Sequence, residues 1–113
     1  MIYEFYLETY TLNPKPFISI SQNEIKEKYN KADYFAPSGI AIHPITKNIY
    51  VITSIGKMMA EFSPEGKLLA VFDIDYPHFQ QPEGISFDKN GDLYISNEAK
   101  GKKANILKFK YLL

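Results

Sequence analysis

The chain of 113 residues contains no cysteine. This absence excludes a disulfide framework, a thiolate zinc site and a cysteine nucleophile. It leaves the cellular compartment open, because a protein without thiols does not respond to the redox state around it.

Arginine and net charge are also absent. All 13 basic residues are lysines and 13 acidic residues balance them, so the formal net charge is zero. The sequence therefore has neither the planar guanidinium that reads phosphates and bases nor a field that attracts polyanions. We expect no nucleic-acid partner.

Long apolar runs are missing as well. The longest lie near residues 49–52 and 68–72, and each has the size of a strand rather than the roughly 20 residues of a membrane helix. The first residues, Met1-Ile2-Tyr3-Glu4, carry acid where a signal peptide carries lysine or arginine. We therefore expect no transmembrane segment and no signal peptide in this sequence.

What the chain does contain is an internal repeat. Residues 35–52 are echoed by residues 81–96, at an offset of 45 at the shared Pro and Gly and of 44 at the shared Tyr. A period of this length is typical of the four-stranded blades of β-propellers. A slip by one residue fits a hairpin turn, which tolerates insertions. Each unit is predicted to form a meander of short antiparallel strands.

Turn residues favour strands over helices in both units. Segments 63–66 and 88–91 each place a Gly after turn-forming residues and between apolar runs, as tight hairpin connections do. Alternating large and small side chains indicate that segments 39–42 and 84–87 are inner strands with one narrow face. Further strands are expected at residues 48–54 and 67–74.

The first 34 residues are predicted to differ from the repeat. Two strands, Ile2 to Leu7 and Phe17 to Ile20, would be joined by the loop at residues 13–16. Ser21 and Glu24 have the spacing of a capping box, so a short helix is expected from about residue 22 to residue 29.

The repeated segments carry a family resemblance. Residues 35–44, 81–88 and 92–98, with the motif Gln81-Pro82-Glu83-Gly84-Ile85, resemble the C-terminal part of the SdiA-regulated family, bacterial six-bladed propellers related in pattern to NHL repeats. The resemblance extends across nearly the whole chain. It implies an all-β fold of antiparallel four-stranded blades and a location in the periplasm or at the cell surface, and it implies no established activity.

On this basis the chain is one incomplete propeller domain of about two and a half blades. Residues 1–34 would form the second half of a blade with a short helical connector, and residues 35–78 a complete blade. Residues 79–113 would form a final blade that lacks its fourth strand. Because such a chain cannot close a ring, we expect its exposed blade faces to be covered by further blades or by self-association.

Glu83 is the first candidate for a ligand-binding residue. It precedes the Gly that begins an inner strand, and a Glu of similar placement binds a divalent cation in lactonase-like propellers. With Glu98 and Asn97 at the end of the next strand, it would form an oxygen site for Ca²⁺ or Mg²⁺ at the mouth of the propeller channel. The competing interpretation is a carboxylate that accepts backbone N–H groups, since the preceding repeat has Ser38 at this position.

Other polar residues are expected to be structural. His43 and His78 are the only histidines and lack the spacing of a metal site, so a solvated or turn-capping role is expected for both. Asp88 and Asp92 flank a Gly-bearing turn and are read as turn residues. The lysines between residues 100 and 110 are read as solvated surface.

These observations favour a non-catalytic binding or interaction scaffold of the bacterial cell envelope, with an unknown protein or small-molecule ligand. The alternative is a propeller hydrolase of the lactonase-like or phytase-like kind, in which Glu83 and Glu98 act as paired acid and base. Several further carboxylates or histidines facing the channel from other blades would favour the enzyme, and none would favour the scaffold.

Overall fold

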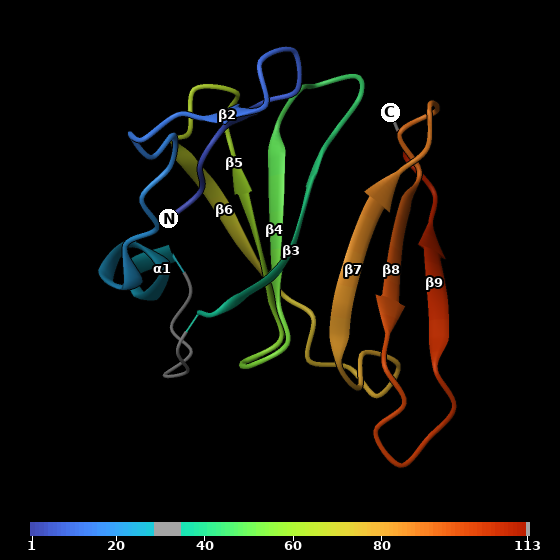
Figure 1. The fold of residues 1–113 in the computed structure, drawn as a ribbon. Helices are drawn as coiled ribbons and strands as arrows, with labels where there is room; N and C mark the ends of the chain where they lie inside the picture. Colours follow the sequence, from blue (N-terminus) through green and yellow to red (C-terminus); the bar gives the residue numbers. More distant parts are fainter. Residues whose placement is uncertain (29–34, 113) are drawn as a thin grey trace.

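The computed structural model describes residues 1–28 and 35–112 as antiparallel β-sheets with one short helix (Figure 1). The strands form three sheets, in the orders β1-β2, β3-β4-β5-β6 and β7-β8-β9. The predicted all-β class is confirmed, and the meandering sheets are those of a partial propeller. The bounds are β1 Phe5–Tyr6, β2 Thr11–Leu12, α1 Gln22–Lys28, β3 Pro37–Ile42, β4 Ile49–Thr53, β5 Met58–Phe62, β6 Leu68–Asp73, β7 Pro82–Phe87, β8 Leu93–Asn97 and β9 Asn105–Phe109.

Two glycine-bearing turns connect neighbouring strands as predicted. The amide of Gly66 donates to the carbonyl of Ser63 at 2.9 Å, and the amide of Gly91 donates to the carbonyl of Asp88 at 3.0 Å. Both glycines have positive φ angles, 93° and 87°, a conformation that costs a residue with a Cβ considerably more. The turns therefore fix the register of the β5–β6 and β7–β8 pairs.

The β3–β6 sheet is covered on both faces. Alternation along β4 sends Val51 into a core cluster with Ile18, Ile25 and Phe35, and sends Ile52 into a second cluster shared with the β7–β9 sheet. Figure 1 shows α1 on the side of the β3–β6 sheet that faces away from β7–β9. The β7–β9 sheet thus has one covered face and one open face in the described part of the chain.

The first strands of the two large sheets lie close together. The hydroxyl of Ser38 on β3 donates to the carbonyl of Pro82 on β7 at 2.9 Å. A Cβ added to Gly39 would lie 3.0 Å from the carbonyl oxygen of Glu83, and one added to Gly84 would collide with Oγ of Ser96. The first approach, between the two sheets, explains the glycine at position 39, and the second, with the partner residue on β8, explains the glycine at position 84.

The prediction of two N-terminal strands at residues 2–7 and 17–20 is wrong in extent, since the strands of this N-terminal segment are β1 and β2. Ile2 meets Ile18 only at an isolated antiparallel bridge, and the short pair β1–β2 closes through a turn in which Tyr10 has a φ of 53°. Because Phe5 and Tyr6 pair with Leu12 and Thr11 instead, a ladder between residues 2–7 and 17–20 cannot be continuous. The apolar side chains of this segment remain largely exposed as a result.

The predicted helix is confirmed within the described residues. Oγ of Ser21 accepts the amide of Glu24 at 3.3 Å, which is the N-terminal half of a capping box. Ile25 is the buried residue of the helix and anchors it to the first core cluster. Residue 29, the expected last residue, lies outside the described part. No helix in the described part is both long and apolar enough to cross a bilayer.

Candidate functional site

Three polar side chains meet where β7 begins and β8 ends. Nε2 of Gln81 donates to Oε1 of Glu83 at 3.1 Å and to Oε2 of Glu98 at 3.2 Å. The backbone holds the same corner, because the amide of Glu98 donates to the carbonyl of Gln81 at 3.0 Å. Glu83 is half-buried and Glu98 is exposed. We call Gln81, Glu83 and Glu98 the Gln81 cluster.

A β-bulge explains why Glu83 points to this corner. The β7–β8 register shifts between Pro82 and Gly84, so Glu83 has no partner residue directly across the ladder. The same shift occurs in the β3–β4 pair between Pro37 and Gly39. Bulges redirect a side chain and recur at functional edges of sheets. The bulge therefore occurs at the same position of both units. Its residue is Ser38 in the first unit and the carboxylate Glu83 in the second.

Asn97 is directed elsewhere. Its side chain is buried, with 3% exposure, and Nδ2 donates to Oδ1 of Asn105 at 3.0 Å across the β8–β9 pair. Nδ2 of Asn105 donates in turn to the carbonyl of His78 at 3.1 Å. Oδ1 of Asn97 is buried and has no hydrogen-bond partner in the described structure. The structure thus joins Glu83 to Glu98 and joins Asn97 to Asn105, and the assignment of all three as ligands of one cation stays a prediction.

Gln80 braces the loop beside the cluster. Its Nε2 donates to the carbonyl of Glu98 at 3.0 Å and to the carbonyl of Lys103 at 2.7 Å. Gln80 and Gln81 together therefore hold Glu98 and the loop that follows β8. Neither glutamine was predicted as a site residue, although the preceding repeat has Phe35 and Ala36 at these positions. The change from apolar to amide side chains between the two units was the available signal.

Within residues 1–28 and 35–112, no group of three or more His, Asp or Glu side chains is arranged to hold a metal ion. The Gln81 cluster supplies two carboxylates and one amide. Carboxylate and amide oxygens are ligands that Ca²⁺ accepts, with backbone carbonyls and water completing the coordination.

Comparison with known proteins identifies the family. The model of the SdiA-regulated family matches residues 6–100. The chain belongs to the SdiA-regulated family. The match includes the whole β3–β6 sheet, β7, β8 and the Gln81 cluster, which confirms the predicted resemblance and a propeller-type protein. A comparison with curated proteins gives no match.

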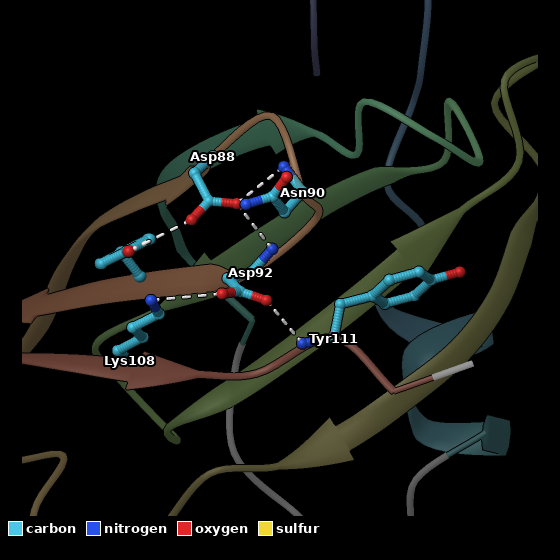
Figure 2. A network of polar contacts seen from close by, with 6 residues as sticks. Asp88, Asn90, Asp92, Lys108 and Tyr111 are labelled. Carbon is cyan, nitrogen blue, oxygen red and sulfur yellow. Dashed lines mark hydrogen bonds and ion pairs between the residues drawn. The ribbon is translucent and has the colours of Figure 1, made fainter.

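In this SdiA-regulated chain, the two aspartates of the β7–β8 connection belong to a turn network (Figure 2). Oδ1 of Asp88 accepts the amides of Asn90 at 2.9 Å and of Asp92 at 3.0 Å. Oδ1 of Asp92 accepts the amide of Tyr111 at 2.9 Å, and Oδ2 forms an ion pair with Lys108 at 3.2 Å. The Tyr111 amide first, and Lys108 next, hold the pKa of Asp92 below its ordinary value. Both aspartates act as structural acceptors, as their turn positions predicted.

His43 performs the same capping in the preceding unit of this SdiA-regulated chain. Nδ1 accepts the amides of Ile45 and Thr46, each at 3.2 Å. The imidazole is 2% exposed and lies 4.8 Å, between ring centroids, from both Phe87 and Tyr111. The predicted turn-capping role is confirmed. The alternative of a solvated side chain is wrong, because the β7–β9 sheet and the C-terminal residues cover the ring.

Proposed function

We propose that this SdiA-regulated chain is part of a non-catalytic binding scaffold of the bacterial cell envelope, and that the Gln81 cluster binds a divalent cation, Ca²⁺ or Mg²⁺. The observation that carries the proposal is the sharing of one amide group by Glu83 and Glu98. Two carboxylates held this way form a compact acceptor for a cation or for the donor groups of a bound molecule.

Charge supports the same conclusion. The cluster brings two negative groups to one neutral amide, and repulsion between like charges that share a site favours capture of a cation. Rotation of the Gln81 amide would turn its carbonyl oxygen toward the position that Nε2 holds now. The cluster would then offer oxygens from three side chains, the donor type that Ca²⁺ and Mg²⁺ require.

The proposal is tested by calorimetric and thermal titration of the full chain with CaCl₂ and MgCl₂. A bound ion should raise the unfolding free energy by about 2.7 kcal/mol at a concentration ~100 times its Kd. Glu83→Gln and Glu98→Gln should each abolish the gain. Glu65→Gln, on the exposed β5–β6 turn, should bind like the parent chain. An equal response in all four proteins, or no response in the parent, contradicts the proposal.

The envelope location is tested separately. An epitope-tagged copy of the complete native gene should be recovered in the periplasmic or cell-surface fraction of its own bacterium. Recovery with cytoplasmic marker enzymes would contradict the location and leave the cation proposal standing, since the two rest on different measurements.

The same carboxylate pair favours hydrolysis as a second candidate function. Glu83 is half-buried and Glu98 is exposed, so their unequal environments suit an acid and a base. Turnover of lactones or phosphoesters that is lost in Glu83→Gln and kept in Glu65→Gln would favour the enzyme. An absence of turnover across such a panel would leave the binding scaffold as the function.

A further inference from the structure

We propose that a second copy of this chain docks its residues Tyr3 to Leu7 along the open edge of β9, as a fourth strand of the β7–β9 sheet. The partner is thus the chain itself, and the contact joins the N-terminal segment of one copy to the C-terminal sheet of another. The inference does not depend on the cation site, because the Gln81 cluster lies where β7 begins and β8 ends and takes no part in the contact.

The receiving side is a strand edge beside an apolar cavity. Among the described strands, β9 pairs with β8 alone, so its outer edge presents unpaired backbone groups to any added strand. Next to this edge, between the two large sheets, lies a cavity of about 520 Å³. Its apolar lining includes Met59, Ile74, Phe79, Leu93, Leu107 and Phe109.

The internal repeat shows what belongs in such a cavity. In the β3–β6 sheet a fourth strand, β6, lies beside β5, and its Leu68 and Val71 pack into the first core cluster. The third strand of the next sheet, β9, lacks this neighbour in the described structure. A strand at the equivalent place would direct alternate apolar side chains into the cavity, as β6 does on its own sheet.

Residues 3–7 have the pattern of that strand. Tyr3, Phe5 and Leu7 alternate with Glu4 and Tyr6, and all but the acid are large and apolar or aromatic. Tyr3, Phe5 and Leu7 are 43%, 53% and 76% exposed, so they are available for contact with a second copy. β1 pairs with β2 on one edge, which leaves its opposite edge to meet β9. Only Phe5–Tyr6 are strand in the single chain and Leu7 begins the turn, so docking extends β1 by residues on both sides.

One antiparallel register satisfies both faces. With Glu4 of one copy opposite Lys108 of the other, Phe5 lies opposite Leu107 and Tyr3 opposite Phe109, on the face that lines the cavity. On the other face Glu4 meets the Lys108 ammonium, which is 55% exposed. A shift by one residue would put Glu4 against the apolar cavity instead, and burial of an unpaired carboxylate there is unfavourable.

The contact is head to tail. Because the two surfaces are different, each copy keeps one donor segment and one receiving edge, so association continues past the dimer unless the geometry closes a ring. Sedimentation of the full chain over a range of concentrations should therefore show a series of oligomers. A chain that stays monomeric at all concentrations overturns the proposal, whereas open oligomers or a closed ring, a reciprocal dimer included, support it.

Substitutions of exposed residues then locate the contact. Phe5→Asp places a charge in the apolar cavity and should weaken association by about tenfold or more. Glu4→Lys should weaken association roughly twofold to fivefold, and Glu65→Lys should not. Equal association of Phe5→Asp and the parent overturns the proposal.

A peptide provides an independent test with the unaltered chain. A synthetic peptide of the first eight residues, Met1 to Glu8, should bind the β9 edge and reduce the mean mass of the oligomers. The same peptide with Asp in place of Phe5 should do neither. If the two peptides act alike, or if neither competes with association, the N-terminal segment is not the docking strand.

Discussion

The hydroxyl of Tyr50 donates a 2.5 Å hydrogen bond to Oε2 of Glu61, directly across the β4–β5 pair. Asn48 donates to the same oxygen at 3.0 Å. In the next unit the equivalent Tyr94 lies opposite Lys108, and Lys108 pairs with Asp92. The repeat thus conserves the geometry of a cross-strand polar contact while exchanging the sign of its charged member.

Replacement of Tyr50 tests the first of these contacts. Burial, and then the bond to Glu61, raises the pKa of Tyr50 above its ordinary value of 10.0. The stabilisation is therefore complete below that value and is lost as the pH rises through it toward the raised pKa of the folded state. Tyr50→Phe should cost about 1 kcal/mol at neutral pH. Urea unfolding at neutral and alkaline pH should show a steeper alkaline loss in the parent than in the variant; parallel losses would contradict this account.

Removal of the Asp92 carboxylate tests the tether of the C-terminal residues. Because the folded state lowers the pKa of Asp92 from its ordinary 3.8, its stabilisation is complete above that value and is lost as the pH falls below it. Asp92→Ala should abolish hydrogen-exchange protection of the Tyr111 amide. Lys108→Gln keeps the acceptor of that amide and should preserve most of the protection. Equal loss in both variants would mean that the ion pair, rather than the backbone hydrogen bond, holds the segment.

A substitution at Gly84 tests the close contact between β7 and Ser96 on β8. A Cβ on Gly84 would collide with Oγ of Ser96, while Cβ of Ser96 would lie 3.6 Å away, in ordinary contact. Gly84→Ala should therefore destabilise the fold by about 1–3 kcal/mol. Adding Ser96→Ala should restore most of that loss in a double-mutant cycle of chemical unfolding. Absence of rescue would place the strain elsewhere on β7.

Substitutions at His43 test whether His43 and Asp88 cap equivalent turns in the two units. His43→Ala leaves the amides of Ile45 and Thr46 without their acceptor and opens space beside Phe87, so it should cost about 2 kcal/mol or more. His43→Asp restores an acceptor of the kind that Asp88 provides at the equivalent place and should cost less. Unfolding of both variants in urea checks the order, and a larger loss for His43→Asp would contradict the capping role.

Local patterns predicted much of the fold. The turns at positions 66 and 91 have a left-handed backbone that favours glycine, so a glycine after turn-forming residues predicted each turn regardless of the rest of the chain. The shared Pro and Gly at 37, 39, 82 and 84 likewise marked the repeat and its inner strands, although the bulges at the starts of β3 and β7 were not predicted. Such features follow from the covalent geometry of one or two residues, and that is why they can be read without a structure.

Contacts that depend on tertiary packing could not be read in the same way. The segment from Ile2 to Leu7 has strong strand propensity, yet Phe5 and Tyr6 pair with β2 across a hairpin turn and only Ile2 pairs with Ile18. Glu83 and Glu98 were correctly expected to lie near each other, but Gln81 as the group that joins them was missed. Its two hydrogen bonds arise because a bulge and a strand end coincide in space.

The most direct test of the cation-binding proposal is the NMR signal of the Gln81 side-chain amide during a titration with Ca²⁺ or Mg²⁺. Binding between Glu83 and Glu98 must break or turn the two hydrogen bonds that this amide donates. We expect its resonances to shift with saturation in the parent chain and to stay unchanged on titration in Glu83→Gln. A Gln81 signal that does not move in the parent up to high cation concentration would contradict a cation site at this cluster.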